Sequence, residues 1–257
     1  MKDRLWELKQ AADGGGLELY IYGDVEGRTF DWENCRYVTS ENSAQHFREE
    51  LSKYPNAKRI DIYINSYGGD VFEGTAIYTQ LKRHQARKVV HVDGFACSIA
   101  SVIAMAGDEV IMPRNTLMMI HNMWVRACGN AAELRKAADD LDVINTAGRQ
   151  AYLQKAGDKL PEDQLAEMMD AETWLTAERC VELGLADRLA DEDADMSGAA
   201  AILQKVNASM EQRLQYQKML AAQLRELANV PAPGATHEAN PQGSGNPDKN
   251  KVLSLFA

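Results

Sequence analysis

Residues 60–70 read Ile-Asp-Ile-Tyr-Ile-Asn-Ser-Tyr-Gly-Gly-Asp, and this stretch decides the fold class. Its first six residues are rich in β-branched and aromatic side chains, which is typical of a strand, and the two glycines then let the chain turn sharply. Apolar residues at helical spacing follow over residues 71–83, and a further apolar strand is predicted over residues 88–92. Strand, helix and strand of these lengths predict a βαβ unit and therefore a largely parallel sheet.

The segments on either side of this unit continue the alternation of strands and helices. Periodicity and turn residues predict strands over residues 17–22, 109–112 and 117–121, and helices over residues 40–54, 98–106, 130–170 and 176–184, with Gly157 and Pro161 interrupting the long helical segment. Together these elements predict one α/β domain over residues 1–188. The chain has 257 residues, of which 45% are hydrophobic, so it can bury a core of this size.

Composition argues against several classes of partner. The net charge is −10, so a basic surface for nucleic-acid phosphates is not expected, and peptides or small molecules are better candidates. The N-terminal residues lack the apolar segment of a secretory signal, and no apolar run is long enough to span a membrane. The four cysteines are far apart, without a histidine at metal-ligand spacing, which predicts neither a zinc site nor a disulfide framework. We therefore expect a cytoplasmic protein.

The pattern changes after residue 188. Residues 191–195 are an acidic linker, and residues 199–228 contain no glycine or proline. Apolar residues recur there every three or four positions and predict a helix with one apolar stripe: Leu203, Val206, Met210, Leu214, Leu220, Leu224 and Leu227. This helix either folds back on the core or stays exposed for a partner, and the linker favours the second. We assign residues 189–229 to the linker and a scaffold-like helix, and residues 230–257 to a flexible tail rich in proline and glycine.

The first candidate for chemistry is the turn at Gly68 and Gly69. It follows a predicted strand and precedes a predicted helix, and its glycines leave backbone N–H groups unhindered, as binding of an oxyanion or a peptide backbone requires. A plain tight turn is the alternative interpretation. The two common glycine-rich phosphate-binding patterns are absent from the sequence.

The second candidate is Ser98, within residues 94–101, which read Gly-Phe-Ala-Cys-Ser-Ile-Ala-Ser. The predicted strand ends at Val92, Gly94 turns the chain, and a helix of small residues begins. Ser98 is therefore expected near a helix N-terminus, where the helix dipole favours developing negative charge. Two other interpretations stay open. Ser98 and Ser101 could be small residues that allow close helix packing, or Cys97 could be the nucleophile, although small buried cysteines are commonly packing residues.

The remaining candidates are one histidine and two acids. His121 ends the apolar run of residues 117–120, so it lies at the mouth of a predicted parallel strand, where ligands bind in such sheets. A lone histidine in this position is also compatible with a purely structural role. Asp170 and Glu172 precede the predicted helix over residues 176–184, and they could orient an imidazole or act only as capping charges.

Taken in this order, the motifs resemble those of the ClpP-type serine peptidases, and in particular the ClpP-like head maturation proteases of tailed phages. The resemblance covers residues 17–188 and rests on four segments: Asn-Ser-Tyr-Gly-Gly at 65–69, Ala-Cys-Ser-Ile-Ala at 96–100, Met-Ile-His-Asn at 119–122, and the stretch from Leu-Thr-Ala at 175 to Gly-Leu-Ala-Asp at 187. Tyr67, Cys97 and Ile99 depart from the residues that are common in the family, which alters the pocket but not the chemistry.

The resemblance implies a role for each candidate. Ser98 would be the nucleophile, His121 the general base, and Asp170 the acid that holds the imidazole, with Glu172 as the alternative acid. The oxyanion hole would consist of the backbone N–H groups of two residues, Gly69 and Ile99. The chemistry so implied needs no metal and no organic cofactor.

The resemblance also implies a crotonase-like α/β core with a helical handle over residues 129–160, in a homo-oligomer that forms rings of seven in this family. The function it favours is a serine endopeptidase that processes phage capsid or scaffolding protein, in the host cytoplasm or the immature head. The extra helix and tail favour this function over a general degradative peptidase. Other hypotheses are a non-proteolytic scaffold on the same core and an acyl-CoA hydratase or isomerase, which the ordered Ser98, His121 and Asp170 argue against.

Overall fold

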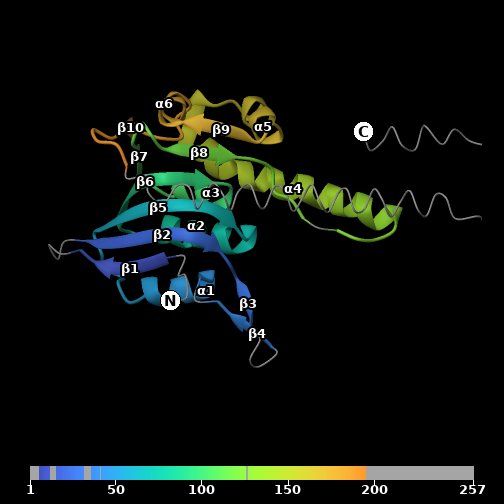
Figure 1. Ribbon diagram of the computed structural model, residues 1–257, viewed down its shortest axis with the longest axis horizontal. Coiled ribbons are helices and arrows are strands. Elements are labelled where there is room, and N and C mark those ends of the chain that lie inside the picture. The colour runs from blue at the N-terminus through green and yellow to red at the C-terminus, as the bar shows by residue number, and fades with distance from the viewer. Residues whose placement is uncertain (1–5, 12–15, 32–35, 41, 126, 195–257) are drawn as a thin grey trace, which may run out of the picture. The chain divides into compact units, whose positions relative to one another are not determined.

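The structure is a computed structural model, and it describes residues 6–11, 16–31, 36–40, 42–125 and 127–194. An eight-stranded mixed sheet forms its centre, with strands in the order β1-β2-β5-β6-β7-β10 and with β8 pairing to both β6 and β9 (Figure 1). The strands are β1 (Trp6–Gln10), β2 (Leu17–Val25), β5 (Arg59–Gly69), β6 (Arg87–Cys97), β7 (Glu109–Met112), β8 (Leu117–Ile120), β9 (Thr173–Thr176) and β10 (Arg188–Leu189). A separate hairpin joins β3 (Arg28–Asp31) to β4 (Arg36–Thr39).

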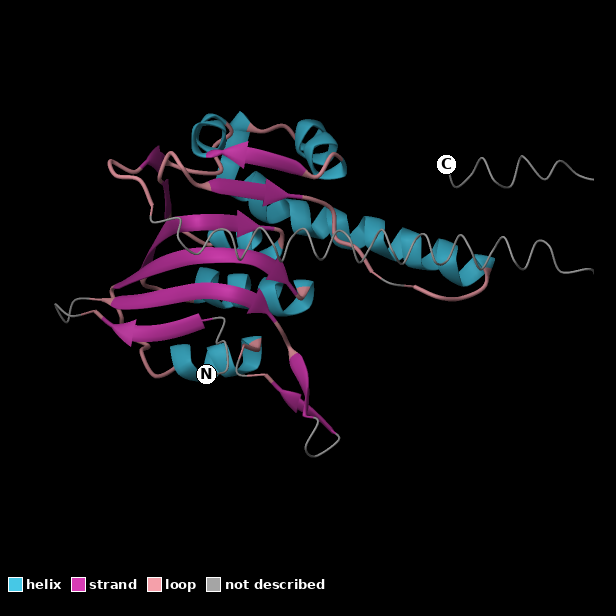
Figure 2. Ribbon diagram, viewed as in Figure 1, coloured by secondary structure: helices cyan, strands magenta, loops and turns pink. Residues whose placement is uncertain are grey.

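The central strands pair in parallel, which confirms the α/β class. Strand β5 runs parallel to β2 and β6, and β6 runs parallel to β7 and β8. Alternate residues of β2, β5 and β6 are buried on one face: Leu17, Leu19, Ile21, Ile60, Ile62, Ile64, Val90 and Val92. The helices α1 (Ala44–Leu51), α2 (Val71–Arg83) and α3 (Ile99–Ala104) cover that face (Figure 2). Burying this apolar surface is the main stabilisation of the domain.

Strand β6 changes partner along its length. Its first half pairs with β7 over Val89–His91, and its second half pairs with β8 over Phe95–Cys97. Because both pairings are parallel, the carboxyl ends of β6 and β8 lie next to each other at the same edge of the sheet. Residues that directly follow the two strands are thereby brought together.

The long helix α4 (Ala131–Ala156) occupies the segment expected to form the handle. Asn130 and Glu133 form a capping box at its start. The first half of the helix is mostly exposed and extends away from the sheet, whereas Ala151, Tyr152 and Ala156 in its second half are buried against the core (Figure 1). A short 3-10 turn (Gly157–Lys159), α5 (Glu162–Asp170) and α6 (Ala177–Glu182) follow. The helix therefore connects an exposed arm to the interior of the domain.

Several elements differ in extent from the sequence predictions. Strand β5 does not end before the glycines but continues through Gly68 and Gly69. Its pairing with β2 is interrupted by a bulge after Tyr22 and then resumes, so that Gly68 and Gly69 still pair with β2. The predicted helix over residues 40–54 is shorter, since Ser43 caps α1 and the helix ends at Leu51. Strands β1 and β9, which sequence patterns did not identify, lie at or near the edges of the sheet. Short edge strands carry little periodicity, so their pairing depends on their neighbours.

The chain stays attached to the sheet slightly beyond residue 188. Ala190 N–H donates to the Met112 carbonyl, and Asn115 exchanges two hydrogen bonds with the backbone of Ala194, at 2.7 and 2.9 Å. The predicted helix over residues 199–228 and the tail over residues 230–257 lie outside the described residues. Among the helices that the structure does describe, none combines the length and the apolar character needed to cross a bilayer.

A pair of glycine substitutions tests how tightly the end of β5 is packed. Gly23 and Gly68 have φ of +109° and +108°, but an added Cβ meets nothing within 4 Å at Gly23, whereas at Gly68 it would lie 2.8 Å from the Ser98 Cβ. Gly23→Ala should lower the free energy of unfolding by about 1–2 kcal/mol through backbone strain alone. Gly68→Ala should lower the free energy of unfolding by about 1–3 kcal/mol more than Gly23→Ala does, because its Cβ would also crowd Ser98. Chemical denaturation measures both, and equal losses would contradict the close packing.

Candidate active site

Ser98 lies at the junction of β6 and α3 in a strained conformation. Its φ is 54° and its ψ −129°, which a residue with a side chain rarely adopts. The Ser98 N–H donates to the Met119 carbonyl of β8 at 2.8 Å, which ties the strained residue to the neighbouring strand. Such strain costs on the order of 1–3 kcal/mol and clusters at functional sites. The fold therefore holds Ser98 in a backbone geometry that it would not adopt by itself.

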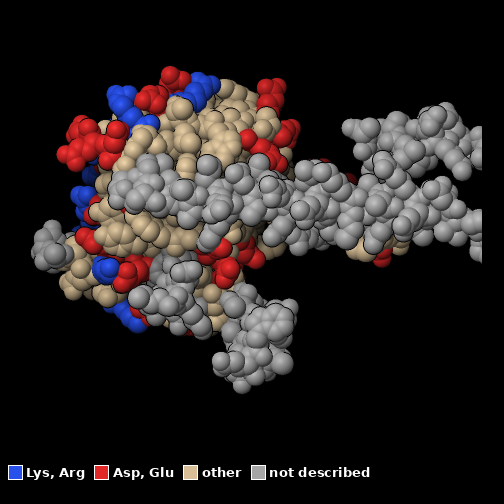
Figure 3. Space-filling model, in the orientation of Figure 1, with Lys and Arg blue, Asp and Glu red and all other residues tan. Residues whose placement is uncertain are grey.

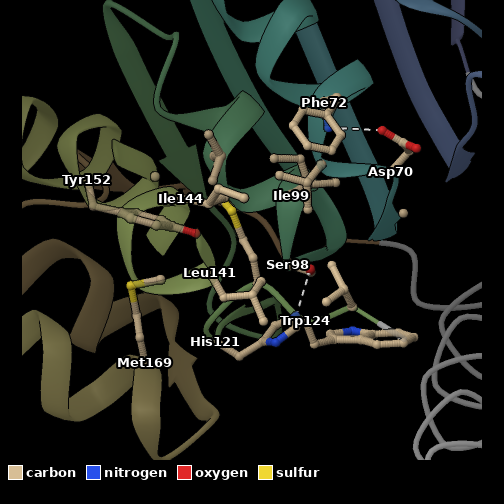
Figure 4. A pocket seen from close by; sticks show the side chains of 16 residues that line it. Asp70, Phe72, Ser98, Ile99, His121, Trp124, Leu141, Ile144, Tyr152 and Met169 are labelled. Atoms are coloured by element: carbon tan, nitrogen blue, oxygen red, sulfur yellow. Dashed lines mark hydrogen bonds between the residues drawn. The ribbon is translucent and has the colours of Figure 1, made fainter. Parts of the chain in front are cut away.

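His121 directly follows β8 and contacts Ser98. Its Nε2 lies 2.7 Å from the Ser98 Oγ, within the range of a good hydrogen bond (Figure 4). The two side chains meet because the parallel register pairs Cys97 with Met119. Ser98 follows Cys97 by one residue, and His121 follows Met119 by two. A hydroxyl bonded to an imidazole nitrogen is the arrangement in which a base can activate a nucleophile.

Gly68 and Gly69, at the end of β5, lie directly against Ser98 and its neighbours. A Cβ on Gly68 would be 2.8 Å from the Ser98 Cβ and 3.2 Å from the Ile99 nitrogen, so only glycine allows the two chain segments to approach this closely. Gly69 and Ile99 both line the pocket into which Ser98 and His121 open. The structure thus brings the two residues expected to form an oxyanion hole to the same side of the site as the hydroxyl.

Of the two candidate acids, Asp170 is the last residue of α5 and Glu172 lies in the turn between α5 and β9. The Asp170 carboxylate accepts a hydrogen bond of 2.5 Å from Nδ2 of Asn122, the residue after His121. Glu172 has a positive φ of 49°. The antiparallel register of β8 and β9, which pairs Ile120 with Thr173, brings Glu172 opposite His121 when it is continued by one residue. The structure thus shows Asp170 in contact with the neighbour of His121, and it places Glu172 opposite His121 in the extended strand register.

A pocket of about 240 Å³ opens beside Ser98. Its walls are largely apolar and come from α2, α3, α4, the segment after His121, and α5: Val71, Ile99, Val102, Met123, Trp124, Val125, Leu141, Ile144, Tyr152 and Met169 among others (Figure 4). Three residues around it expose apolar side chains, Phe72 by 72%, Val125 by 53% and Trp124 by 40%. The site can therefore accommodate an apolar side chain next to the hydroxyl.

The alternative nucleophile, Cys97, has the wrong environment. Its side chain is buried among Phe95, Met119 and neighbouring residues, and burial raises the pKa of the Cys97 thiol to about 12. Because the thiolate is the nucleophilic form of cysteine, Cys97 is unreactive near neutral pH. It is a packing residue, as small buried cysteines commonly are.

Among the residues that the structure places, no group of three or more His, Cys, Asp or Glu side chains could hold a metal ion. On the face shown in Figure 3, basic and acidic side chains are interspersed along the left edge, where β5 and β6 begin. Ion pairs there include Arg59 with Asp61 and Arg87 with Glu109. This edge is opposite the carboxyl ends of the strands, where Ser98 lies.

Sequence patterns did not single out the residues that α4 contributes to the site. Leu141, Ile144 and Tyr152 line the pocket, although they lie far from Ser98 along the chain. The sequence predicted only a helical segment there, because periodicity does not identify what a helix packs against. The same holds for Trp124 and Val125, which follow His121 in an irregular segment.

Comparisons with known proteins agree with this geometry. The family model described as Clp protease matches residues 38–193. The ATP-dependent Clp protease proteolytic subunit 3 of Rhodococcus jostii is 29% identical over 140 residues, which are 54% of this chain and 68% of the relative. Proteolytic subunits of ATP-dependent Clp proteases from Deinococcus radiodurans and Pleurastrum terricola are 28% and 30% identical, over 55% of this chain and 69% and 72% of their own lengths.

The matched region contains the parallel strands from β5 to β8, Ser98, His121 and the turn between α5 and β9, but not β2. It also covers well over half of the described chain, so the agreement extends to the fold and not only to short motifs. The chain therefore belongs to the Clp protease family and is a serine-type peptidase with a ClpP-like α/β fold.

Proposed function

We propose that this chain is a serine endopeptidase in which Ser98 is the nucleophile and His121 the general base. The observation that carries the proposal is the 2.7 Å contact between the Ser98 Oγ and the His121 Nε2, at the mouth of an apolar pocket. His121 takes the Ser98 proton as Oγ attacks the peptide carbonyl, and it then protonates the leaving amine. Water, deprotonated by His121, hydrolyses the acyl-enzyme and regenerates Ser98.

The remaining roles follow from position. The backbone N–H groups of Gly69 and Ile99 donate to the oxyanion of the tetrahedral intermediate, whose negative charge develops beside the start of α3. Asp170 is the acid that we propose to orient His121 and to stabilise the imidazolium. Its carboxylate accepts a hydrogen bond from Asn122, the residue that follows His121. No step of this reaction requires a metal or an organic cofactor.

The pocket indicates the class of substrate. Its apolar lining and the exposed Phe72, Trp124 and Val125 suit an extended polypeptide with an apolar side chain before the scissile bond. A folded protein would not reach a pocket of about 240 Å³ with its buried side chains. The substrate is therefore an unfolded, flexible or partly assembled protein segment.

For the biological role, we propose processing of phage capsid or scaffolding protein during head maturation, by a homo-oligomer in the host cytoplasm or the immature head. The support is the sequence beyond the family match, which ends at residue 193. Residues 199–228 have the apolar stripe of a helix suited to bind a partner helix, and such segments occur in assembly proteins. A general degradative peptidase is the second candidate, favoured by the relatives described as proteolytic subunits of ATP-dependent proteases.

Co-expression with candidate substrates separates these roles. The full chain and Ser98→Ala are each expressed with capsid and scaffolding proteins, and the products are identified by mass spectrometry. Wild type should cleave at defined bonds, and Ser98→Ala should slow cleavage by at least about 1,000-fold, because the hydroxyl nucleophile is gone. Cleavage that persists in Ser98→Ala would show that Ser98 is not the nucleophile. Unselective digestion of unrelated unfolded proteins would favour the degradative role.

A matched pair of substitutions tests the acid. Asp170→Asn keeps the shape of the side chain but removes the charge that stabilises the imidazolium, so we expect kcat for a peptide substrate to fall about 10²–10⁴-fold. Glu172→Gln is the control, with a fall of less than about tenfold. The reverse pattern would assign the role to Glu172, which the strand register brings opposite His121.

Peptide substrates that differ only in the residue before the scissile bond test the pocket. Leucine or methionine there should give kcat/KM at least about tenfold above alanine, since a few buried methylene groups contribute on the order of 1–3 kcal/mol. Aspartate should be the poorest, because the apolar pocket gives its charge no partner. Equal rates for leucine and aspartate would exclude this pocket as the substrate site.

A further inference from the structure

Ser101 holds the carbonyl group of Ser98. The Ser98 carbonyl accepts two hydrogen bonds from Ser101, one from its Oγ at 2.5 Å and one from its backbone N–H at 3.0 Å. The opposite end of the Ser98 residue is held by its own N–H, which donates to the Met119 carbonyl. The strained backbone of Ser98 is therefore fixed on both sides, and the Ser101 hydroxyl is the only side chain among these bonds.

The Ser101 hydroxyl has a further partner on α4. Its Oγ lies 2.7 Å from the Tyr152 hydroxyl, 51 residues along the chain, and Ser101 is fully buried. The direction of this bond follows from the number of protons. The Ser101 hydroxyl has one proton, and the Ser98 carbonyl can only accept, so Ser101 donates to Ser98. The Tyr152 O–H must then donate to the Ser101 Oγ.

Tyr152 is well suited to be a permanent donor. It is 2% exposed, and burial raises the pKa of its hydroxyl above the ordinary value, so the hydroxyl stays protonated wherever the protein is active. The side chain reaches from α4 towards the pocket beside Ser98 (Figure 4). A buried hydroxyl needs a hydrogen-bond partner, and Ser101 provides it.

The Tyr152 bond also decides where the Ser101 proton points. The Met119 carbonyl lies 3.5 Å from the Ser101 Oγ and is the competing acceptor. With Tyr152 donating to one side of the Ser101 oxygen, the proton is directed to the nearer Ser98 carbonyl. Without that donor, the hydroxyl can rotate towards Met119, whose carbonyl already receives the Ser98 N–H. Both bonds that hold the strained residue would then weaken together.

We propose that Tyr152 and Ser101 are positioning residues for the nucleophile, forming a chain of hydrogen bonds from α4 to the Ser98 carbonyl that keeps the Ser98 Oγ directed at His121. The proposal rests on the proposed role of Ser98 as the nucleophile. It assigns α4 a part in the reaction beyond lining the pocket. Neither residue touches the reacting atoms, so both act through the backbone of Ser98.

The test uses the full chain and four variants: Tyr152→Phe, Ser101→Ala, the double variant, and Thr116→Val. Thr116 is buried and its hydroxyl donates to the Pro113 carbonyl at 2.8 Å, at the far end of β8 from His121, so Thr116→Val is a matched loss of one buried hydrogen bond. Labelling of Ser98 by a fluorophosphonate probe, located by mass spectrometry, reports the reactivity of the hydroxyl. Peptide hydrolysis supplies kcat and KM, and thermal unfolding reports stability.

Loss of one neutral hydrogen bond corresponds to about a fivefold change in rate when it acts only on the reacting geometry. Tyr152→Phe should therefore slow labelling and kcat about fivefold, and Ser101→Ala about tenfold or more, with KM within about twofold of wild type. The double variant should match Ser101→Ala within about twofold, because the two residues act in one chain. Thr116→Val should lower the melting temperature without slowing the labelling of Ser98.

Each other outcome has a definite meaning. If wild type is not labelled at Ser98, the proposed function fails, independently of Tyr152. If wild type is labelled and Tyr152→Phe reacts at the same rate, the positioning role is overturned. If Tyr152→Phe raises KM and leaves kcat unchanged, Tyr152 only lines the pocket. If the losses of the two single variants multiply in the double variant, Tyr152 and Ser101 act independently and not in one chain. A shift of the acidic limb of the pH profile in Tyr152→Phe would place its action on His121 instead.

Discussion

The hydrogen bond from the Ser98 N–H to the Met119 carbonyl is the interaction on which the site depends. It extends the parallel pairing of β6 and β8 by one residue past the end of β6, and it holds Ser98 with a positive φ that serine does not favour. The Ser98 side chain then meets His121, which follows β8. The pairing of strands in the sheet thus imposes a backbone conformation on Ser98 that neither a helix nor a strand alone would give it.

The strain at Ser98 is tolerated because three surrounding elements oppose its release. The turn at Gly68 leaves no room for a Cβ, β8 takes the N–H, and α3 returns a hydroxyl to the carbonyl through Ser101. Helix α4 adds Tyr152 behind Ser101, so an element that extends away from the core also contacts the network around Ser98. The stability of the domain and the geometry of the site therefore depend on the same buried contacts.

The sequence predicted that the central elements exist but not where all of them end, and it missed the edge strands. Strand β6 continues to Cys97, beyond its predicted end at Val92. Helix α2 and strand β7 have the predicted bounds, because long or strongly apolar segments have clear periodicity. Strands β1 and β9 were missed, since short edge strands are defined by pairing rather than by composition. Local context singled out Ser98 and His121 as candidates, a serine at a helix start and a histidine at a strand end; the structure brings them into contact, and their catalytic roles stay predictions. The third member stays a prediction, because the order of residues does not separate Asp170 from Glu172.

By itself, the sequence determined the alternation of strands and helices, the glycine turn and the residue types available for chemistry, since all of these depend on local periodicity and backbone preference. Tertiary structure alone decided which residues meet. The 2.7 Å contact between Ser98 and His121 requires two strands to pair in one register, and the bond between Ser101 and Tyr152 requires α4 to pack against α3. Such contacts join residues distant in the chain, and their distances are fixed only when burial of the shared core sets the strands and helices in place.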